Sequence, residues 1–457
     1  MANDSVLLKD LLVFTKDGEW GKGEAGEGLI EMSVIRGTDF EDVRLGDTGS
    51  VPLRYIPEQI AARKRLQPGD ILLETAGGTK DQPTGRTVFL KKHFFERHQT
   101  RPFTCASFSR FLRVDSSLAD SEYVYWYLKH LYFTGEMYLY HVQHTGVARF
   151  QYTEFAAKTR IPLPPLPTQR AIARILGALD DKIELNRRQS ATLEALARAV
   201  FQSWFMDFDP VRARAAGRAP AAMDAATAAL FPDGFDVVDG REVPRGWKLT
   251  YLREVAKFIK GLSYKSSYLQ DSPTALVTLK SIGRGGGYRD EGLKPYTGEY
   301  KSEQVVQPGE IVVAHTDLTQ AAEVLGRPAL VRPHQLYSTL VASLDLMVVR
   351  PMIEWVSREF LYDLLGREGF REHAYGYSNG TTVLHLSVKA LPEYLFVLPS
   401  PEVVQAFTTR AQPLYRKLEQ NELQSRTLAA LRDALLPRLL SGELRVRTAE
   451  RLVAERV

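Results

Sequence analysis

The sequence predicts an α/β protein of the α+β kind, in which two similar globular domains are joined by two long antiparallel coiled-coil helices. Three observations predict this fold. The 457 residues exceed what one hydrophobic core usually serves, one helical segment occurs twice, and a proline-containing strip precedes each copy. Residues 186–199 recur 235 positions later as residues 421–434, in the same helical phase. The chain is therefore expected to be an internal duplication with pseudo-twofold symmetry.

Short segments of the two globular halves also match. Each half contains a Gln-Pro-Gly-acidic turn that leads into an apolar strand, and each contains a Gly-Arg pair that enters a second strand. The matching pairs are Leu8–Phe14 with Leu252–Phe258, Gln67–Ile71 with Gln307–Ile311, Gly85-Arg86 with Gly326-Arg327, and Gly146 with Gly380.

The helix after each proline strip carries apolar or amide residues at intervals of seven. These are Ile172, Leu179, Asn186, Leu193 and Val200 in the first helix, with Leu196 as a companion, and Phe407, Leu414, Asn421, Leu428 and Leu435 in the second. Such a repeat is typical of a coiled coil, although each helix could also lie as an ordinary amphipathic helix on its own domain.

Amide side chains stand at the middle of both repeats. In an antiparallel pair, Asn186 would face Gln424 and Gln189 would face Asn421. An unpaired buried amide costs about 1 to 3 kcal/mol, so we expect these four residues to fix the register and the orientation of the helix pair.

The expected domain organisation follows from these patterns. Residues 1–167 and 244–399 form the two globular domains, residues 168–208 and 400–442 form the two helices, residues 209–243 form a linker and residues 443–457 form a tail. The linker is rich in alanine and arginine and has low complexity.

The composition excludes several classes of protein. The chain has no run of about 18 apolar residues and no secretory signal, so it is expected to be a soluble cytoplasmic protein. A single cysteine, Cys105, excludes a disulfide framework and a cysteine-rich zinc site, and is expected to be a small apolar residue in a strand. The net charge of +4 indicates an anionic partner only weakly, but residues 63–114 hold 11 Lys and Arg against 4 Asp and Glu.

Several motifs in the helices and joints resemble one known family, the DNA-specificity subunits of type I restriction-modification enzymes. The motifs are residues 161–170, 176–186, 201–205, 207–210, 244–247 and 435–444. The resemblance implies two target recognition domains, each reading one half of a split DNA sequence, held apart by the helix pair. Two methyltransferase subunits would dock on the helices, and motor-nuclease subunits would join outside. The second proline strip departs from the pattern, because Val403 stands where the first strip has Gln169.

No catalytic motif was found in the chain. An S-adenosylmethionine loop, an Asn/Asp-Pro-Pro-aromatic turn and a nucleotide-binding Gly-rich motif ending in Lys-Ser/Thr are all absent. His141 and His144 have helical ligand spacing but no third ligand, so no metal is expected. The chain is expected to be non-catalytic by itself, with S-adenosylmethionine, ATP and Mg²⁺ bound by partner subunits. The alternative is a coiled-coil adaptor whose globular units bind other proteins.

The duplication also sorts the candidate double-stranded DNA contacts. Residues that the two halves share should build the fold or hold phosphates, and residues that differ should read bases. The unlike segments, which could also be ordinary solvated loops, contain Lys80, Gln82, Gln143 and His144 in the first half and Gln320, Tyr377, Ser378 and Asn379 in the second. Backbone contact is expected from Lys91, Lys92, Arg97, Arg101 and Arg110. The shared Arg86 and Arg327 are scaffold or phosphate residues, and Arg284 in the flexible glycine-rich loop 283–287 completes the set.

Large apolar side chains cluster where the first helix ends. Trp204, Phe205 and Phe208 are predicted to bind a partner subunit, because such residues commonly anchor interfaces. The alternative is that they are buried against the chain's own linker.

Overall fold

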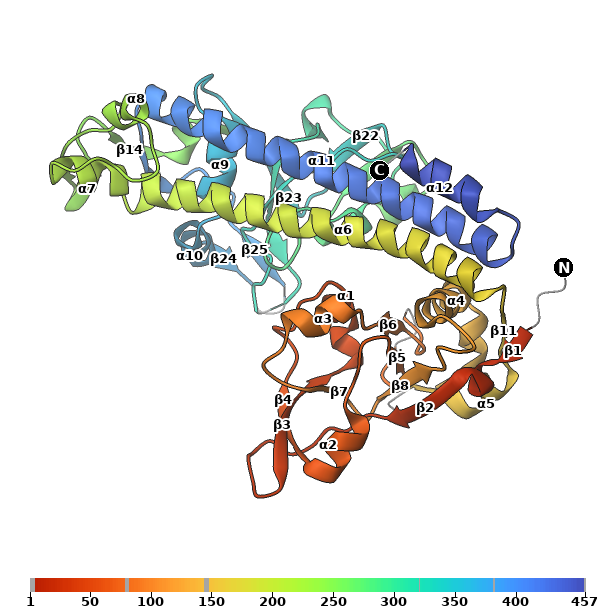
Figure 1. Cartoon of the computed structure of the whole chain (residues 1–457). Coiled ribbons are helices and arrows are strands. Elements are labelled where there is room, and N and C mark those ends of the chain that lie inside the picture. Colours follow the sequence, from red (N-terminus) through yellow and green to blue (C-terminus); the bar gives the residue numbers. More distant parts are fainter. Residues whose placement is uncertain (1–4, 79–81, 144–147, 320, 381–382, 456–457) are drawn as a thin grey trace. The chain divides into compact units, whose positions relative to one another are not determined.

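The computed structural model describes residues 5–78, 82–143, 148–319, 321–380 and 383–455. The chain divides into two compact units (Figure 1): unit 1 is Met1–Arg187 with Leu423–Val457, and unit 2 is Arg188–Glu422. No helix in the described part of the chain has both the length and the apolar character that a membrane crossing requires.

Unit 1 is built on a sheet in the order β2-β8-β5-β6, formed by β2 (Leu12–Asp17), β8 (Ser109–Val114), β5 (Ile71–Glu74) and β6 (Thr87–Phe89). Strand β5 begins after the predicted turn, in which Gly69 has φ of 90° and the Asp70 carboxylate accepts a hydrogen bond from the Gln67 amide. All four residues of β5 are buried, as expected for the apolar run of a central strand.

A second sheet of unit 1 has the order β4-β3-β7, formed by β4 (Leu53–Pro57), β3 (Leu29–Ile35) and β7 (Phe103–Cys105). Cys105 is buried in β7, as the sequence predicts. The helices α1 (Phe40–Arg44), α2 (Glu58–Lys64) and α3 (Lys92–Arg97) connect these strands (Figure 1). Helix α4 (Ser121–Phe133) is capped by Asp120, whose carboxylate accepts from the Tyr123 amide. Unit 1 also contains β1 (Ser5–Leu7) paired with β11 (Arg160–Pro162), α5 (Tyr152–Lys158) and α12 (Val446–Ala454).

Unit 2 repeats the first sheet of unit 1. Its strands have the order β15-β23-β19-β21, formed by β15 (Ala256–Lys260), β23 (Leu346–Pro351), β19 (Ile311–Ala314) and β21 (Pro328–Leu330). The register is repeated as well, because Ile311 pairs with Val349 as Ile71 pairs with Leu112. The internal duplication therefore extends to the pairing of individual residues.

A second sheet in unit 2 has the order β17-β16-β22-β18, formed by β17 (Lys294–Pro295), β16 (Thr274–Val277), β22 (Thr339–Ala342) and β18 (Val305–Val306). Strands β16 and β22 run parallel, as β3 and β7 do in unit 1. Strand β14 (Lys248–Tyr251) pairs with β26 (Leu395–Leu398), and β12 (Phe235–Val238) pairs with β13 (Arg241–Pro244). Unit 2 also contains the helices α7 (Asp209–Ala215), α8 (Ala225–Ala229), α9 (Arg358–Leu365) and α10 (Glu368–Gly376).

The two long helices are α6 (Leu166–Phe201), which continues as a π-helical turn over Gln202–Met206, and α11 (Pro401–Leu440). Within unit 1 they run antiparallel, because Asn186 of α6 donates to Gln424 Oε1 at 2.9 Å and Asp180 accepts from Arg432 at 2.5 Å. The pairing of Asn186 with Gln424 is the one that the heptad register predicts. The role of the four amides in fixing that register stays a prediction, as do the domain boundaries.

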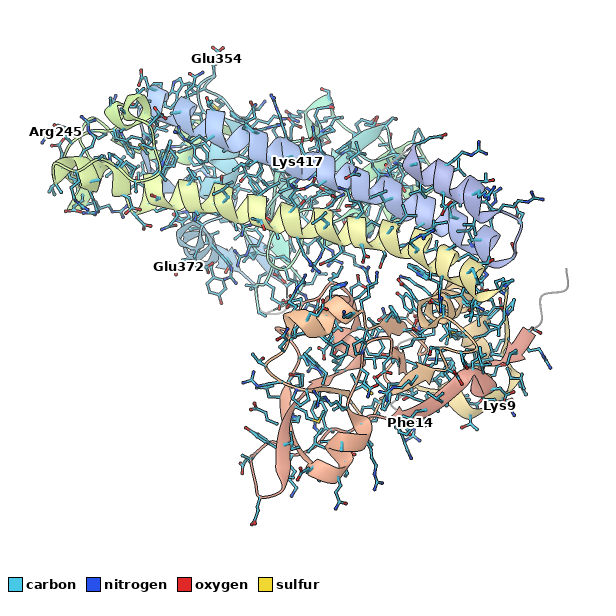
Figure 2. The ribbon with its side chains drawn as sticks, viewed as in Figure 1. Lys9, Phe14, Arg245, Glu354, Glu372 and Lys417 are labelled. Atoms are coloured by element: carbon cyan, nitrogen blue, oxygen red, sulfur yellow. The ribbon has the colours of Figure 1, made fainter. Side chains whose placement is uncertain are left out.

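On the outward face of α11, Lys417 lies exposed (Figure 2).

The predicted coiled-coil contact at Leu196 is wrong. This side chain is 50% exposed, whereas the neighbouring Ala197 and Phe201 are buried in the core of unit 2. A straight α-helix has 3.6 residues per turn and drifts by about 20° per heptad against a strict repeat of seven, so the buried stripe leaves the predicted positions toward the end of α6.

The predicted partner anchors are also corrected. Trp204 and Phe205 are buried in the core of unit 2, Trp204 being 5% exposed, and their rings pack against Phe407 of α11. Trp204 also meets Phe231 of the linker segment in an edge-to-face contact. Phe208 is partly buried on the same core. Burial on the chain's own linker and helices, the alternative that the sequence left open, describes these residues.

Candidate nucleic-acid interface

A small sheet in unit 1 contains Gln143 of one predicted reading segment and adjoins the loop that carries the other. It consists of β9 (His141–Gln143), β10 (Ala148–Phe150) and Ala76, which bridges to Arg149. Two backbone hydrogen bonds join the segment after β5 to β10, from the Phe150 amide to the Thr75 carbonyl at 2.8 Å and from the Gly77 amide to the Ala148 carbonyl at 3.2 Å. The chain leaving β5 is therefore held against β10.

The far end of the same loop is held on β9. The Thr84 amide donates to His141 Nδ1 at 3.1 Å, and the Thr84 hydroxyl lies 3.0 Å from the same nitrogen. Both ends of the loop that contains Gln82 are thus fixed on the small sheet of unit 1. Gln82 and Gln143 are exposed. Lys80 and His144 lie outside the described residues.

The small sheet of unit 2 has the same plan. It consists of β20 (Thr316–Asp317), β25 (Leu384–Leu386) and β24 (Ser378–Asn379), in the order β20-β25-β24. Its strands bring together the second pair of predicted reading segments, although Gln320 lies outside the described residues. Asn379 is exposed. The Tyr377 hydroxyl donates to Glu393 at 2.7 Å and the Ser378 hydroxyl to the Tyr375 carbonyl at 2.7 Å, so both hydroxyls bond within the chain.

A buried carboxylate shapes the loop that leaves β20. Asp317 accepts hydrogen bonds from the Thr319 amide at 2.8 Å on one oxygen, and from the amides of Val324 and Leu325 at 2.8 and 3.2 Å on the other. Three backbone donors therefore fix the two ends of this loop on one side chain.

A groove of about 450 Å³ lies beside this loop, between residues 279–291 and 317–324. Its lining includes the cations Lys280, Arg284 and Arg289. The predicted Arg284 is 79% exposed and lies 3.2 Å from Glu323. The lining also includes Glu291, Asp317 and Glu323, and Arg289 lies 3.5 Å from Glu291, so the charges of the groove are balanced and it shows no excess of positive charge.

Positive charge acts on a histidine behind the small sheet of unit 2. His315 is buried, and burial together with the charges of Lys260 and His385 lowers the pKa of His315 to about 4. His315 is therefore neutral at physiological pH and is a buried residue of unit 2.

Two of the predicted DNA contacts in unit 1 form ion pairs with carboxylates of the same unit. Arg86 forms two hydrogen bonds with the buried Glu74, at 2.9 and 2.6 Å, which corresponds to the scaffold role that the sequence left open. Lys91 lies 2.7 Å from Asp181 of α6. Burial alone would lower the pKa of Lys91, but the carboxylates of Glu122 and Asp181 raise it. The contact of Lys91 with the DNA backbone stays a prediction, and in this structure its ammonium group is paired with Asp181 of α6.

The other predicted cations differ in their availability. Arg101 pairs with Glu31 at 2.6 Å, Arg110 pairs with Asp17 at 2.8 Å, and Arg327 lies 3.8 Å from Glu368. Lys92 is 81% exposed, and the carboxylate that it pairs with, at 3.4 Å, is that of the exposed Glu96 in the same helix. Arg97 is exposed at the end of α3. Lys92 and Arg97 are therefore the cations of α3 best placed to meet a phosphate.

The sequence reasoning missed the exposed residue at the centre of each small sheet, Arg149 in β10 and His385 in β25. Each stands between two buried apolar neighbours, Ala148 and Phe150 in one strand, Leu384 and Leu386 in the other. The alternation of buried and exposed residues over these three positions is the signal that could have found them. In the described part of the chain, no group of three or more His, Cys, Asp or Glu is arranged to hold a metal ion.

Comparisons with known proteins all point to one kind of protein. Residues 61–195 match a family model described as the type I restriction modification DNA specificity domain. The HindI specificity subunit of Haemophilus influenzae is 28% identical over 325 residues, which cover 62% of this chain and 68% of that protein. The MjaIX specificity subunit of Methanocaldococcus jannaschii is 26% identical over 336 residues, covering 71% and 69%.

A solved structure shares the fold over nearly the whole chain. The type I restriction-modification S subunit from M. genitalium superposes with a TM-score of 0.57 at 15% identity, covering 95% of each chain. At this identity the likeness concerns the fold, including both globular parts and both long helices.

Proposed function

We propose that this chain selects the DNA sequence on which a restriction-modification complex acts, as a specificity subunit of the type I restriction-modification family. One observation carries the proposal beyond the family resemblance. Two small sheets with the same plan present unlike exposed residues, as expected of two similar devices that read different sequences.

In the proposed arrangement, each unit contributes one target recognition domain and reads one half of a bipartite DNA target. Helices α6 and α11 set the spacing of the halves and dock two methyltransferase subunits. Motor-nuclease subunits join this assembly in the cytoplasm, and S-adenosylmethionine, ATP and Mg²⁺ are bound by the partner subunits. This chain supplies selection of the sequence, and its partners supply the chemistry. The coiled-coil adaptor function is not favoured by the comparisons.

Selection from a random pool of DNA duplexes tests the proposal. The chain is purified in complex with its methyltransferase subunits, and the bound duplexes are sequenced. We expect one enriched motif with two defined halves separated by an undefined gap. The absence of any enriched motif would refute the proposed function.

Substitutions separate base reading from backbone contact. Lys92→Ala and Arg97→Ala should weaken binding to enriched and scrambled duplexes alike, and each should reduce the slope of log affinity against log salt by about 1. Asn379→Ala should instead weaken binding of the enriched duplex more than that of the scrambled one, because an amide can pair with adenine. An equal loss for both duplexes would exclude base reading by Asn379.

A further inference from the structure

Arg149 and His385 occupy equivalent positions in the duplicated fold. Ala76 and Thr316 each follow the first residue of a matched strand by five positions, counted from Ile71 and Ile311. Ala76 bridges to Arg149, and Thr316 pairs with His385. Each central residue is also paired on its other side, Arg149 with Val142 and His385 with Asn379. The two residues therefore stand at the same point of the two small sheets.

Paired residues of neighbouring strands have their side chains on the same face of a sheet. Arg149 thus shares a face with Val142 in unit 1, and His385 shares a face with the predicted reading residue Asn379 in unit 2. Gln143, which follows Val142 in the strand, has its side chain on the opposite face. Both central side chains are exposed, whereas their neighbours along the strand are buried. The buried neighbours lie on the opposite face of each strand, so the face that carries Arg149 and His385 is the solvent-exposed one.

The chemistry of the two positions differs while the backbone is the same. Within the described residues, the Arg149 side chain forms no hydrogen bond or ion pair, so its fork of donors is free. His385 Nδ1 lies 3.3 Å from the Thr316 hydroxyl. The other ring nitrogen, Nε2, is therefore the one that His385 can offer to a base. A phosphate contact common to both units would favour a cation at both positions. A residue pair that differs in this way is expected where the two units read different bases.

Resting on the proposed function, we propose that Arg149 and His385 are equivalent base-reading residues of the two half-sites, Arg149 taking a guanine in the major groove. The guanidinium offers two parallel donors that match guanine O6 and N7. His385, with one nitrogen held by Thr316, offers a single ring nitrogen to its base. Reading by His385 is accordingly weaker than reading by Arg149.

The test uses the complex of this chain with its methyltransferase subunits and the random duplex pool. Wild type is compared with Arg149→Ala, Arg149→Lys and His385→Ala. Arg63→Ala is the matched control, since Arg63 is an exposed arginine of α2 in the same unit. Arg149→Lys keeps the positive charge and a long side chain and removes only the paired donors of the guanidinium. A change of base preference in this variant is therefore not explained by a folding defect.

We expect Arg149→Ala to reduce the preference for guanine at one position of one half-site roughly 5- to 150-fold, with the other half-site unchanged. Arg149→Lys should weaken the same preference, His385→Ala should produce a smaller change confined to the other half-site, and Arg63→Ala should leave the motif intact. The inference is overturned if the wild-type motif persists in the Arg149 and His385 variants, or if all duplexes lose affinity equally. If wild type itself yields no motif, the proposed function fails first.

Discussion

Replacement of Asp180 by Asn tests whether a buried charge cluster joins the globular part of unit 1 to both long helices. Asp180 of α6 accepts from Arg432 of α11 at 2.5 Å and from Arg44 of α1 at 3.0 Å. Asp180 and both arginine side chains are largely buried. One carboxylate therefore balances cations from two other elements of the unit.

The pKa of Asp180 gives the scale of this interaction. Burial alone would raise it, but the charges of Lys129, Arg44 and Arg432 lower the pKa of Asp180 to about 2, from an ordinary value of 3.8. At 1.36 kcal/mol per pH unit, the ionised carboxylate stabilises the folded state by about 2.4 kcal/mol. Asn mimics the protonated carboxyl, and breaking a buried ion pair from one side costs about 3 to 5 kcal/mol. We expect Asp180→Asn to lower the free energy of unfolding by about 2 to 5 kcal/mol at pH 7.

Urea unfolding, followed by circular dichroism across a pH series, measures this effect. Because the pKa is lowered in the folded state, the stabilisation is fully present above pH 4 and is lost as pH falls toward 2. The wild type and the variant should therefore differ at pH 7 and converge at acid pH. Asp181→Asn is the control, since Asp181 is 58% exposed in its pair with Lys91 and should cost less than about 1 kcal/mol. A difference that does not change with pH, or equal losses for the two variants, would refute the reasoning.

Three further predictions test other parts of the fold. Trp204→Ala should lower the free energy of unfolding by about 3 to 5 kcal/mol in urea titrations, because it empties part of the core of unit 2; an unchanged midpoint would contradict the burial. Burial raises the pKa of Asp363 to about 7, so its ionised form opposes folding above pH 7 and stability rises as pH falls toward 4. Asp363→Asn should therefore raise the melting temperature at pH 8 but not at pH 4, and an equal gain at both would count against this assignment. Burial raises the pKa of Cys105 to about 12, so the folded chain should resist thiol reagents at pH 8 and react only in denaturant, whereas fast labelling of the folded chain would exclude that burial.

The duplicated fold was predictable because its signals are local. The Gln-Pro-Gly turn, the apolar run of β5 and the heptads of α6 each lie within a few helical turns or a few residues of sequence. The prediction was wrong at Leu196, where the drift of the helix moves the buried stripe, and at Trp204, which packs on Phe231 and Phe407 far away in the chain. A strict repeat of seven carries no information about that packing.

The candidate site was only partly predictable, for the same reason. Lys91 and Lys92 are adjacent and chemically identical, yet only Lys91 meets Asp181, which lies 90 residues away in the sequence. The position of Arg149 depends on its pairing with Ala76, which also joins distant parts of the chain. Unlike residues at equivalent positions become visible as a pair only after the strands are aligned in space.

The bonds of Asp317 to its own loop have a consequence for how new specificities arise. The ends of the loop are held by backbone amides, and β25 is held by strand pairing, so the frame depends little on the exposed side chains that it carries. Exposed residues can then be exchanged at small cost in folding free energy, usually within about 0.5 kcal/mol. Mutational drift at these positions can change a DNA preference in a single step while the protein stays folded, and the two half-sites can diverge separately.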